Sequence, residues 1–402
     1  MNILKKSFCR IYQFAFRAAL PVLPYREPKI LKNADEIALT VKNLGIDRVL
    51  MITDEFLKKS GATEKIEKSL ETNKIKCTVY DKTRPNPTVD NVDEALSIYR
   101  SEKCSCLIAF GGGSAMDCAK AVGARVAYPK RTLDGLKGNL RIFRKLPPLF
   151  AVPTTAGTGS EVTVTAVITD PEKKHKYTMN SFPLIPHYAV LDPENTYTLP
   201  PHLTATTGMD ALTHAVEAYI GRSTSRETRR LSKEAVKLVF ENIETAYAQP
   251  ENRIARENML TAAYKAGIAF SKSYVGYIHA VAHSLGGRYN TPHGLANSVL
   301  LPIGLEFYGE TIYNKLYELA LYTGVAKPDD HAQVGAKKFI DKIKLLNKNL
   351  GIPETIGGIK ECDIHTMAKH ADNEGNPLYP VPMLMDRKEL EKFYYAVSDW
   401  SK

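Results

Sequence analysis

The sequence has no apolar run that approaches the roughly 18 residues needed by a membrane-spanning helix, and this excludes an integral membrane protein. It also has no internal repeat and no low-complexity tract. The six cysteines show no zinc-finger spacing, so they indicate a reducing cytoplasm, which is the localisation we expect. At 402 residues the chain is long enough for two or three domains.

Acidic residues are scarce only at the N-terminal end, where residues 1–32 hold seven basic side chains against one acidic side chain. The formal net charge of +10 is therefore concentrated there, and the rest of the chain is only mildly basic. A nucleic-acid-binding protein carries its basic residues as a patch on the folded body. We therefore expect no nucleic-acid partner.

The same N-terminal segment has the pattern of an amphipathic helix. Its apolar residues recur at intervals of three and four and form one stripe, with basic residues on the far side: Leu4, Phe8, Ile11, Ala15, Ala18 and Val22. The favoured interpretation is that this stripe packs on the enzyme body or on a second subunit. Docking of residues 1–24 onto an anionic membrane or an assembly is the second interpretation, and a cleaved organellar transit peptide is the third.

Strand-like and helix-like segments alternate in the first half, with strands expected near 48–52, 76–80, 105–110, 149–152 and 187–191. After Pro200 and Pro201 the periodicity is helical, as in residues 233–247. The fold class predicted is α/β plus all-α, with an N-terminal extension (1–28), a Rossmann-like dinucleotide-binding domain with a parallel sheet (29–197) and an all-helical metal-binding domain (198–402). We expect the active site in the cleft between the two large domains.

Metal-binding side chains gather in two windows of the second half. Asp210 and His214 are four residues apart, as are His279 and His283, and this spacing places each pair on one face of a helix. Gly286 and Gly287 then predict a helix end, and His293, after a proline, is expected at the start of the next helix. One carboxylate and several imidazoles suit iron(II) or zinc better than calcium or magnesium. The pattern predicts a divalent metal site with a spare imidazole beside it.

Glycine-rich turns in the first half indicate a dinucleotide site. The apolar strand that ends at Phe110 is followed by Gly111, Gly112, Gly113 and Ser114 and then by a helix-like segment. Backbone N–H groups at such a helix start can hold a pyrophosphate. A second loop rich in glycine and hydroxyl groups spans 153–161, and Asp54 ends an earlier strand, where a carboxylate can bind a ribose or cap a helix.

These motifs resemble the iron-containing (group III) alcohol dehydrogenase family. The match runs from about Lys29 to about Ala396 and includes GGGSAMD, PTTAGTGSE, GMDALTHAVEAYI and HAVAHSLGGRYNTPHGLAN in the family's order. The resemblance implies that the metal ligands are Asp210, His214, His279 and His293, and that His283 relays the substrate proton. It implies a dinucleotide site formed by Asp54, Asn86, Gly112, Gly113, Ser114, Thr154, Thr155, Thr158 and Lys176, and a substrate pocket that includes Phe270 and Thr165.

The resemblance also sets the expected reaction, which is hydride transfer between a small primary alcohol or aldehyde and a nicotinamide cofactor. The metal would lower the pKa of the alcohol. Asp54 would repel a 2′-phosphate, so NAD is expected in preference to NADP, and Fe²⁺ is expected first with Zn²⁺ second. We also expect a homodimer or a larger homo-oligomer. The alternatives are a metal- and NAD-dependent lyase or cyclase of the dehydroquinate-synthase type, and a non-catalytic assembly protein. Thr165 replaces an asparagine of some family members, so the small-diol preference is not carried over.

Overall fold

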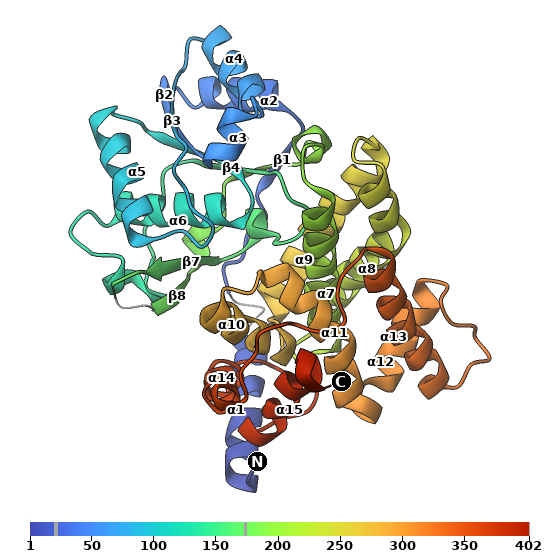
Figure 1. Cartoon of the computed structure of the whole chain (residues 1–402). Coiled ribbons are helices and arrows are strands. Elements are labelled where there is room, and N and C mark those ends of the chain that lie inside the picture. Colours follow the sequence, from blue (N-terminus) through green and yellow to red (C-terminus); the bar gives the residue numbers. More distant parts are fainter. Residues whose placement is uncertain (20–22, 173–174, 402) are drawn as a thin grey trace. The chain divides into compact units, whose positions relative to one another are not determined.

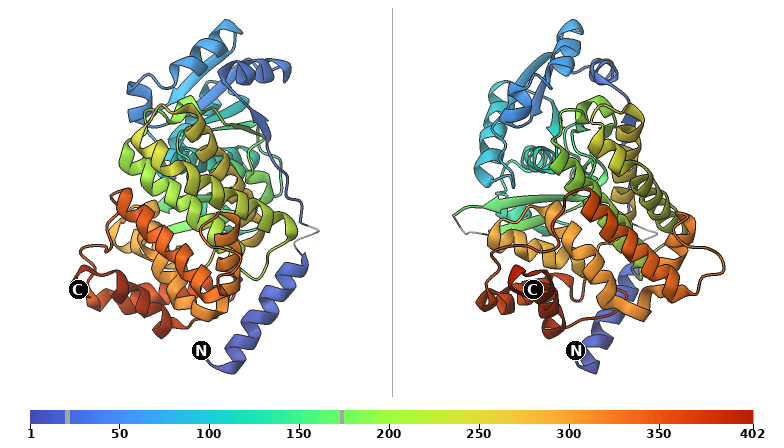
Figure 2. Two further views of the ribbon diagram at one scale, coloured as in Figure 1. Left: turned by 90° about the vertical axis from the view of Figure 1, so that its right-hand side faces the viewer. Right: turned by 45° about the vertical axis from the view of Figure 1, so that its right-hand side comes forward.

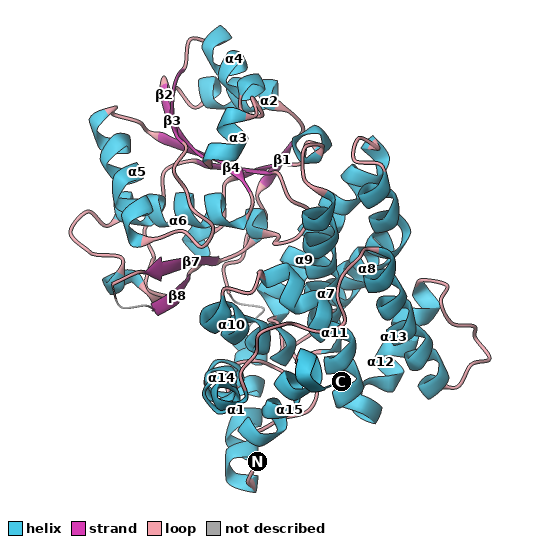
Figure 3. Cartoon of the chain, viewed as in Figure 1, coloured by secondary structure: helices cyan, strands magenta, loops and turns pink. Residues whose placement is uncertain are grey.

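The computed structural model describes residues 1–19, 23–172 and 175–401, and the chain divides into two compact units. The first, the α/β unit, is Pro24–Leu199, and the second, the helical unit, joins Met1–Leu23 to Pro200–Lys402. The named strands all belong to the α/β unit, as the colouring of Figure 3 shows. The predicted fold class is confirmed.

A six-stranded parallel sheet forms the centre of the α/β unit, with the strand order β1-β9-β6-β4-β2-β3. Its strands are β1 (Lys29–Leu31), β2 (Arg48–Ile52), β3 (Lys76–Tyr80), β4 (Cys106–Gly111), β6 (Leu149–Pro153) and β9 (Tyr188–Val190). The five predicted strands are confirmed within one or two residues. The three-residue β1 was missed because so short a segment has no period to detect.

Helices cover both faces of this sheet (Figure 1). They are α2 (Ala34–Asn43), α3 (Glu55–Lys59), α4 (Glu64–Thr72), α5 (Val89–Ser101) and α6 (Gly113–Ala127). Val49 and Met51 of β2 pack in one core with residues of α2 and α4, whereas Leu50 and Ile52 pack in the other core with residues of α5 and α6. A strand buried on both faces is apolar along its length, as β4 is throughout and β2 is after Arg48.

A smaller sheet in the same unit joins β5 (Gly138–Asn139), β8 (His175–Asn180) and β7 (Thr165–Asp170), and β7 and β8 are antiparallel. The sequence analysis did not predict it. Short 3-10 helices complete the unit: η2 (Asp134–Leu136), η3 (Ser160–Val162), η4 (Phe182–Leu184) and η5 (Pro193–Thr196).

The helical unit contains α1 (Ile3–Ala19), α7 (Pro201–Ile220), α8 (Arg226–Ala248), α9 (Arg253–Ser273), α10 (Tyr277–Tyr289), α11 (His293–Tyr308), η6 (Gly309–Ile312), α12 (Tyr313–Tyr322), α13 (Ala332–Asn349), α14 (Glu361–Gly375), α15 (Arg387–Val397) and η7 (Asp399–Ser401). The predicted helix at 233–247 lies within α8, and His293 begins α11 as predicted. The predicted stop at Gly286 and Gly287 is wrong. The last residue of α10 is Tyr289. Asn290 caps the helix in the left-handed conformation, with a φ of 54°.

The orientation of α1 contradicts one half of the favoured interpretation, packing of its apolar stripe on the enzyme body, and leaves packing on a second subunit as a prediction. Leu4, Phe8 and Ile11 are exposed, so this stripe does not pack on the rest of the chain. Polar side chains on the other side of the helix hold α1 instead, because Arg10 and Gln13 donate hydrogen bonds to backbone carbonyls of residues 377–382. Val22 lies outside the described residues. Among those described, no helix combines the length and the apolar character needed to cross a membrane.

Candidate active site

The helix α7 carries three acidic or imidazole side chains on one face. Asp210, His214 and Glu217 follow at intervals of four and three residues, and all three are buried. Buried charge of this kind is costly unless it is paired or binds a metal. The other side chains around this face come from α9, α10 and α11.

Asp210, His214, His279 and His293 meet in the helical unit and form the cluster that the sequence predicted. Each offers one ligand atom, and these four atoms lie within 4.8 Å of one another. The carboxylate oxygens of Asp210 lie close to all three imidazoles: 3.9 Å from Nδ1 of His214, 3.8 Å from Nε2 of His279 and 3.5 Å from Nε2 of His293. These separations leave room for a small ion in contact with all four residues.

Two glycines allow the helices to approach closely enough to form the cluster. A Cβ on Gly294, in the first turn of α11, would lie 2.5 Å from the carbonyl oxygen of Thr206 on α7. A Cβ on Gly276, which precedes α10, would lie 2.5 Å from Oε1 of Glu217. Atoms cannot pack at such distances, so Gly294 is required against the backbone of α7, and a side chain at Gly276 would displace the carboxylate of Glu217.

Glu217 fixes the ring of His279. The Nδ1 atom of His279 lies 2.6 Å from Oε2 of Glu217, and Oε1 accepts a hydrogen bond from the backbone N–H of Ile278. Because the carboxylate occupies Nδ1, the Nε2 atom is left to face Asp210, and it has no hydrogen-bond partner among the described residues. Burial lowers the pKa of His279 well below its ordinary value, and His214 and His293 lower it further. A neutral imidazole with an open, buried Nε2 is the form that binds a metal.

Two further side chains complete the surroundings of the cluster. Asn297, one turn after His293 on α11, donates a hydrogen bond of 2.7 Å to Oδ1 of Asp210 and lies 3.1 Å from Nε2 of His293. Phe270 of α9 stacks on His214 with ring centroids 4.3 Å apart. The predicted pocket residue Phe270 is therefore in direct contact with a member of the cluster.

His283 lies one turn beyond His279 on α10, outside the group of four. Its ring stacks on His293 at 5.1 Å, and its Nδ1 atom lies 2.6 Å from Oε1 of Glu374 on α14. The same oxygen accepts a hydrogen bond from the hydroxyl of Tyr379. Burial alone would raise the pKa of Glu374, but the attraction of His283 and these hydrogen bonds hold the pKa below its usual value. An ionised carboxylate thus orients an imidazole that is partly open to solvent.

The predicted dinucleotide residues all belong to the α/β unit, where the glycine turn meets the loop that contains Thr154, Thr155 and Thr158. A Cβ on Gly112 would lie 3.3 Å from Cγ2 of Thr155, and one on Gly113 would lie 3.1 Å from Cγ2 of Thr158. The backbone N–H of Thr154 donates to the carbonyl of Gly111. The hydroxyl of Thr155 is buried with no hydrogen-bond partner among the residues that the structure describes. The α6 N-terminus and this open hydroxyl are suited to the phosphates of a dinucleotide.

Asn86, Ser114 and Lys176 also meet beside this turn. The ammonium of Lys176 donates to Oδ1 of Asn86 at 2.7 Å, and the backbone N–H of Asn86 donates to the hydroxyl of Ser114 at 3.3 Å. Asn86 has a φ of 56°, a left-handed conformation that asparagine tolerates. Asp54 caps α3 through a hydrogen bond from the N–H of Leu57, and one of its oxygens lies 4.0 Å from the Cβ position of Gly111. The helix cap is thus present, and it lies at the edge of the turn.

Sequence reasoning missed a buried ion cluster behind this loop. The ammonium of Lys120 donates to the hydroxyl of Ser160 and to backbone and side-chain oxygens of Thr163, and Asp117 accepts from Ser160 and from the N–H of Val167. Burial lowers the pKa of Lys120 to about 8. Lys120 also donates to the carbonyl of Thr165, whose hydroxyl donates to Asn180, so Thr165 is part of the α/β unit's own network.

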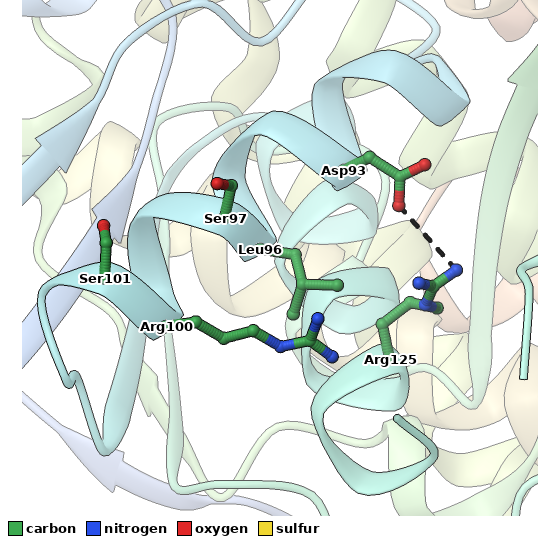
Figure 4. Close-up of a pocket in the computed structure, with 6 residues that line it drawn as sticks. All are labelled: Asp93, Leu96, Ser97, Arg100, Ser101 and Arg125. Carbon is green, nitrogen blue, oxygen red and sulfur yellow. Dashed lines mark ion pairs between the residues drawn. The ribbon is translucent and has the colours of Figure 1, made fainter. Parts of the chain in front are cut away.

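A shallow depression on the α/β unit lies apart from all of these residues (Figure 4). It is lined by Asp93, Leu96, Ser97, Arg100, Ser101 and Arg125 from α5 and α6. An ion pair of 3.7 Å joins Arg125 to Asp93 across it. It contains no predicted site residue and no metal-binding group beyond Asp93, so we assign it no role in the reaction.

A Rossmann-like α/β unit, together with a helical unit that gathers one carboxylate and three imidazoles, is the arrangement expected of a metal-type dehydrogenase. Residues 31–193 match the family described as "Iron-containing alcohol dehydrogenase", and residues 204–397 match "Fe-containing alcohol dehydrogenase family, C-terminal". The chain therefore belongs to the iron-containing alcohol dehydrogenase family. It is an oxidoreductase that acts on alcohols and aldehydes.

Similar proteins agree with this assignment. The 1,3-propanediol dehydrogenase of Citrobacter freundii is 37% identical over 357 residues, which are 88% of this chain and 92% of that protein. The crystal structure of a 1,3-propanediol oxidoreductase is 35% identical with a TM-score of 0.88, and the match covers 92% of this chain and 98% of that one. The sulfoacetaldehyde reductase of Bifidobacterium kashiwanohense in complex with NAD⁺ is 29% identical with a TM-score of 0.84, covering 93% and 98%. These matches do not support the cyclase or the non-catalytic alternative.

Proposed function

We propose that this protein is an NAD(H)-linked alcohol dehydrogenase or aldehyde reductase whose divalent metal is held by Asp210, His214, His279 and His293. The observation that carries the proposal is the convergence of these four ligand atoms within 4.8 Å, with the Nε2 atom of His279 buried and open. Fe²⁺ is the favoured ion and Zn²⁺ the second choice, because a set of one carboxylate and three imidazoles suits both. The ion would polarise the oxygen of the alcohol or aldehyde.

The residues around the ligands have separate tasks. Glu217 holds the Nδ1 atom of His279 and so presents Nε2 to the ion. Asn297 holds the carboxylate of Asp210 beside His293. His283, oriented by Glu374, would accept or return the substrate proton, a task to which the imidazole side chain is suited.

The α/β unit would bind NAD. Gly112, Gly113 and Ser114, at the start of α6, would hold the pyrophosphate with the threonines of the adjoining loop, which are Thr154, Thr155 and Thr158. Asn86 and Lys176, linked by a hydrogen bond, would also hold the dinucleotide. Asp54 keeps one oxygen on its helix cap, so its other oxygen would bind the adenosine ribose and repel the 2′-phosphate of NADP.

The substrate would be a small primary alcohol or aldehyde. Phe270, stacked on His214, would form an apolar wall for it, and Thr165 would take the place of the asparagine found in some relatives. Domain limits of 1–28, 29–197 and 198–402, a homodimer or larger oligomer and a cytoplasmic location are parts of the same proposal. The location agrees with the six free cysteines.

The experiment that tests this function begins with metal analysis of protein purified without oxygen. Aldehydes of increasing chain length are then supplied with NADH or with NADPH, and the disappearance of the reduced cofactor is followed. We expect one divalent ion per chain, steady oxidation of NADH and slower oxidation of NADPH. A cyclase would regenerate its cofactor at each turnover, so the absence of net NADH oxidation with every aldehyde would contradict the proposal.

A further inference from the structure

The helix α1 has two faces of opposite character, and the more apolar one points away from the protein. Five large apolar side chains form this face, which we call the outer face of α1: Ile3, Leu4, Phe8, Ile11 and Phe14. Each is between 60% and 82% exposed. Ala15 and Ala18 continue the face toward the end of the helix, and both are exposed as well. A soluble protein rarely exposes so many large apolar groups on one surface without a partner for them.

The inner face of α1 fixes this orientation through specific polar contacts. Gln13 is buried and donates a hydrogen bond of 2.7 Å to the carbonyl of Tyr379 and one of 3.2 Å to that of Pro377. Arg10 donates to the carbonyls of Val381 and Pro382, at 2.8 and 2.9 Å. These partners lie in the segment between α14 and α15, within the same unit.

Further contacts at each end of the inner face add to this attachment. Lys5 forms an ion pair of 3.0 Å with Asp372 of α14, and Phe16 meets the edge of the Tyr274 ring with centroids 4.9 Å apart. Figure 2 shows α1 as one straight helix at an end of the helical unit. Rotation of α1 to bury its outer face would break all of these contacts, so the exposure of the outer face is a stable feature of the fold.

The charge of α1 indicates the kind of surface that its outer face contacts. The helix has four basic residues and no acidic one, and the first acidic residue of the chain is Glu27. Lys6 and Arg17 are exposed and lie about three helical turns apart, so they share one flank of the outer face, whereas Arg10 is held by the inner contacts. An anionic surface would complement this flank.

A second copy of α1 is a poorer partner than an anionic surface. Two such helices packed face to face would bring basic flanks together, and neither helix has a carboxylate to pair with them. The helix also lies outside the part of the chain shared with the family, since the matches begin at residue 31. A task separate from the family's reaction is consistent with this position.

We propose that α1 attaches this enzyme to the surface of an anionic lipid bilayer. The helix lies parallel to the surface, with its outer face among the acyl chains near the head groups and with Lys6 and Arg17 at the level of the lipid phosphates. Its inner face remains on the helical unit. The attachment is peripheral and reversible, because one short helix contributes limited apolar area and the basic contribution is screened by salt.

Flotation of the full-length protein with vesicles tests this proposal. Vesicles of phosphatidylcholine mixed with phosphatidylglycerol are compared with vesicles of phosphatidylcholine alone, at low and at raised salt. We expect binding to the anionic vesicles at low salt, weaker binding at raised salt, and little binding to the neutral vesicles. Absence of binding to anionic vesicles at low salt would overturn the proposal.

Surface variants locate the binding to the outer face without disturbing the inner contacts. Replacement of Leu4, Phe8, Ile11 and Phe14 together by serine should lower the vesicle partition coefficient by at least ~100-fold, because most of the inserted apolar area is lost. Lys6→Glu with Arg17→Glu should lower it by at least ~10-fold. Both variants should retain the turnover of the parent enzyme in solution.

The matched control changes apolar side chains of similar exposure elsewhere. Phe143→Ser with Ile254→Ser removes side chains that are 75% and 71% exposed but lie outside α1, and vesicle binding should be unchanged. Equal loss in this control would show that binding depends on general hydrophobicity and would overturn the assignment to α1. A smaller oligomer in the four-serine variant, with vesicle binding unchanged, would show that the outer face covers a second copy instead.

Discussion

Glu217→Gln is the change whose effect can be worked out most closely from the structure. Oε2 of Glu217 accepts from Nδ1 of His279, and Oε1 accepts from the N–H of Ile278. Glutamine has one acceptor oxygen and one NH₂ donor, so it cannot accept from both donors in the way that Glu217 does. If the NH₂ group faces His279, the ring proton moves to Nε2, the atom assigned to the metal. If it faces Ile278, two donors oppose each other in a buried site.

The expected magnitude follows from the role of such carboxylates in metal sites. Loss of the partner of a ligating imidazole typically lowers metal affinity by roughly 10- to 100-fold, or about 1.4 to 2.7 kcal/mol. Competition with a chromophoric chelator for Zn²⁺ measures this directly. Glu244→Gln is the matched control, because Glu244 also accepts a side-chain hydrogen bond but lies at the surface of α8. The Zn²⁺ affinity of this variant should equal that of the parent protein. Parent-like Zn²⁺ affinity in Glu217→Gln would refute the reasoning.

Three further changes test other parts of the account. His283→Ala should retain the metal but reduce turnover by roughly 100-fold, the usual scale for a general acid or base; loss of metal would instead make His283 a ligand. Asp54→Gly should reduce the ratio of the catalytic efficiencies with NADH and NADPH in steady-state assays. An unchanged ratio would show that Asp54 serves only as a helix cap. Burial and the charge of Arg26 lower the pKa of His187 to about 4 from an ordinary value of 6.5. The unfolded chain therefore binds the proton first as the pH falls, and stability decreases between these two values. In His187→Gln the free energy of unfolding, measured with denaturant, should depend less on pH between these two values. An unchanged pH dependence would contradict the lowered pKa of His187.

The sequence predicted the elements whose pattern repeats along the chain. The strands from β2 to β9 that belong to the large sheet are short apolar runs bounded by turns, and α8 has a long regular period. The four-residue spacing also predicted which pairs would share a helix face. The cluster forms because α7, α10 and α11 converge. Local spacing pairs Asp210 with His214 but pairs His279 with His283, so the choice of His293 as the fourth member came from the family resemblance.

Contacts between distant segments could not be predicted in this way. Glu374 meets His283 across 91 positions of sequence, and no local pattern indicates that pairing. Glu217 and Asn297 were within reach, because they follow His214 and His293 by three and four residues on the same helix faces. The antiparallel pair of β7 and β8 was not predicted, because no element was proposed for residues 165–180.

The orientation of α1 shows where an amphipathic pattern is ambiguous. The periodicity correctly identifies an apolar stripe, but it does not determine whether this stripe faces the protein or its surroundings. In α1 the attachment depends on Arg10 and Gln13, whose backbone partners are more than 350 residues away in the sequence. Only the folded chain shows that the polar side is the one that is held.

We propose that the cluster of one carboxylate and three imidazoles holds the metal that the reaction requires. The most direct test is to replace His279 by alanine and to measure metal content and aldehyde reduction on the same preparation, with His283→Ala prepared in parallel. We predict that metal occupancy and turnover fall together in His279→Ala, while His283→Ala keeps its metal. Normal turnover in a metal-free His279→Ala protein would contradict the account.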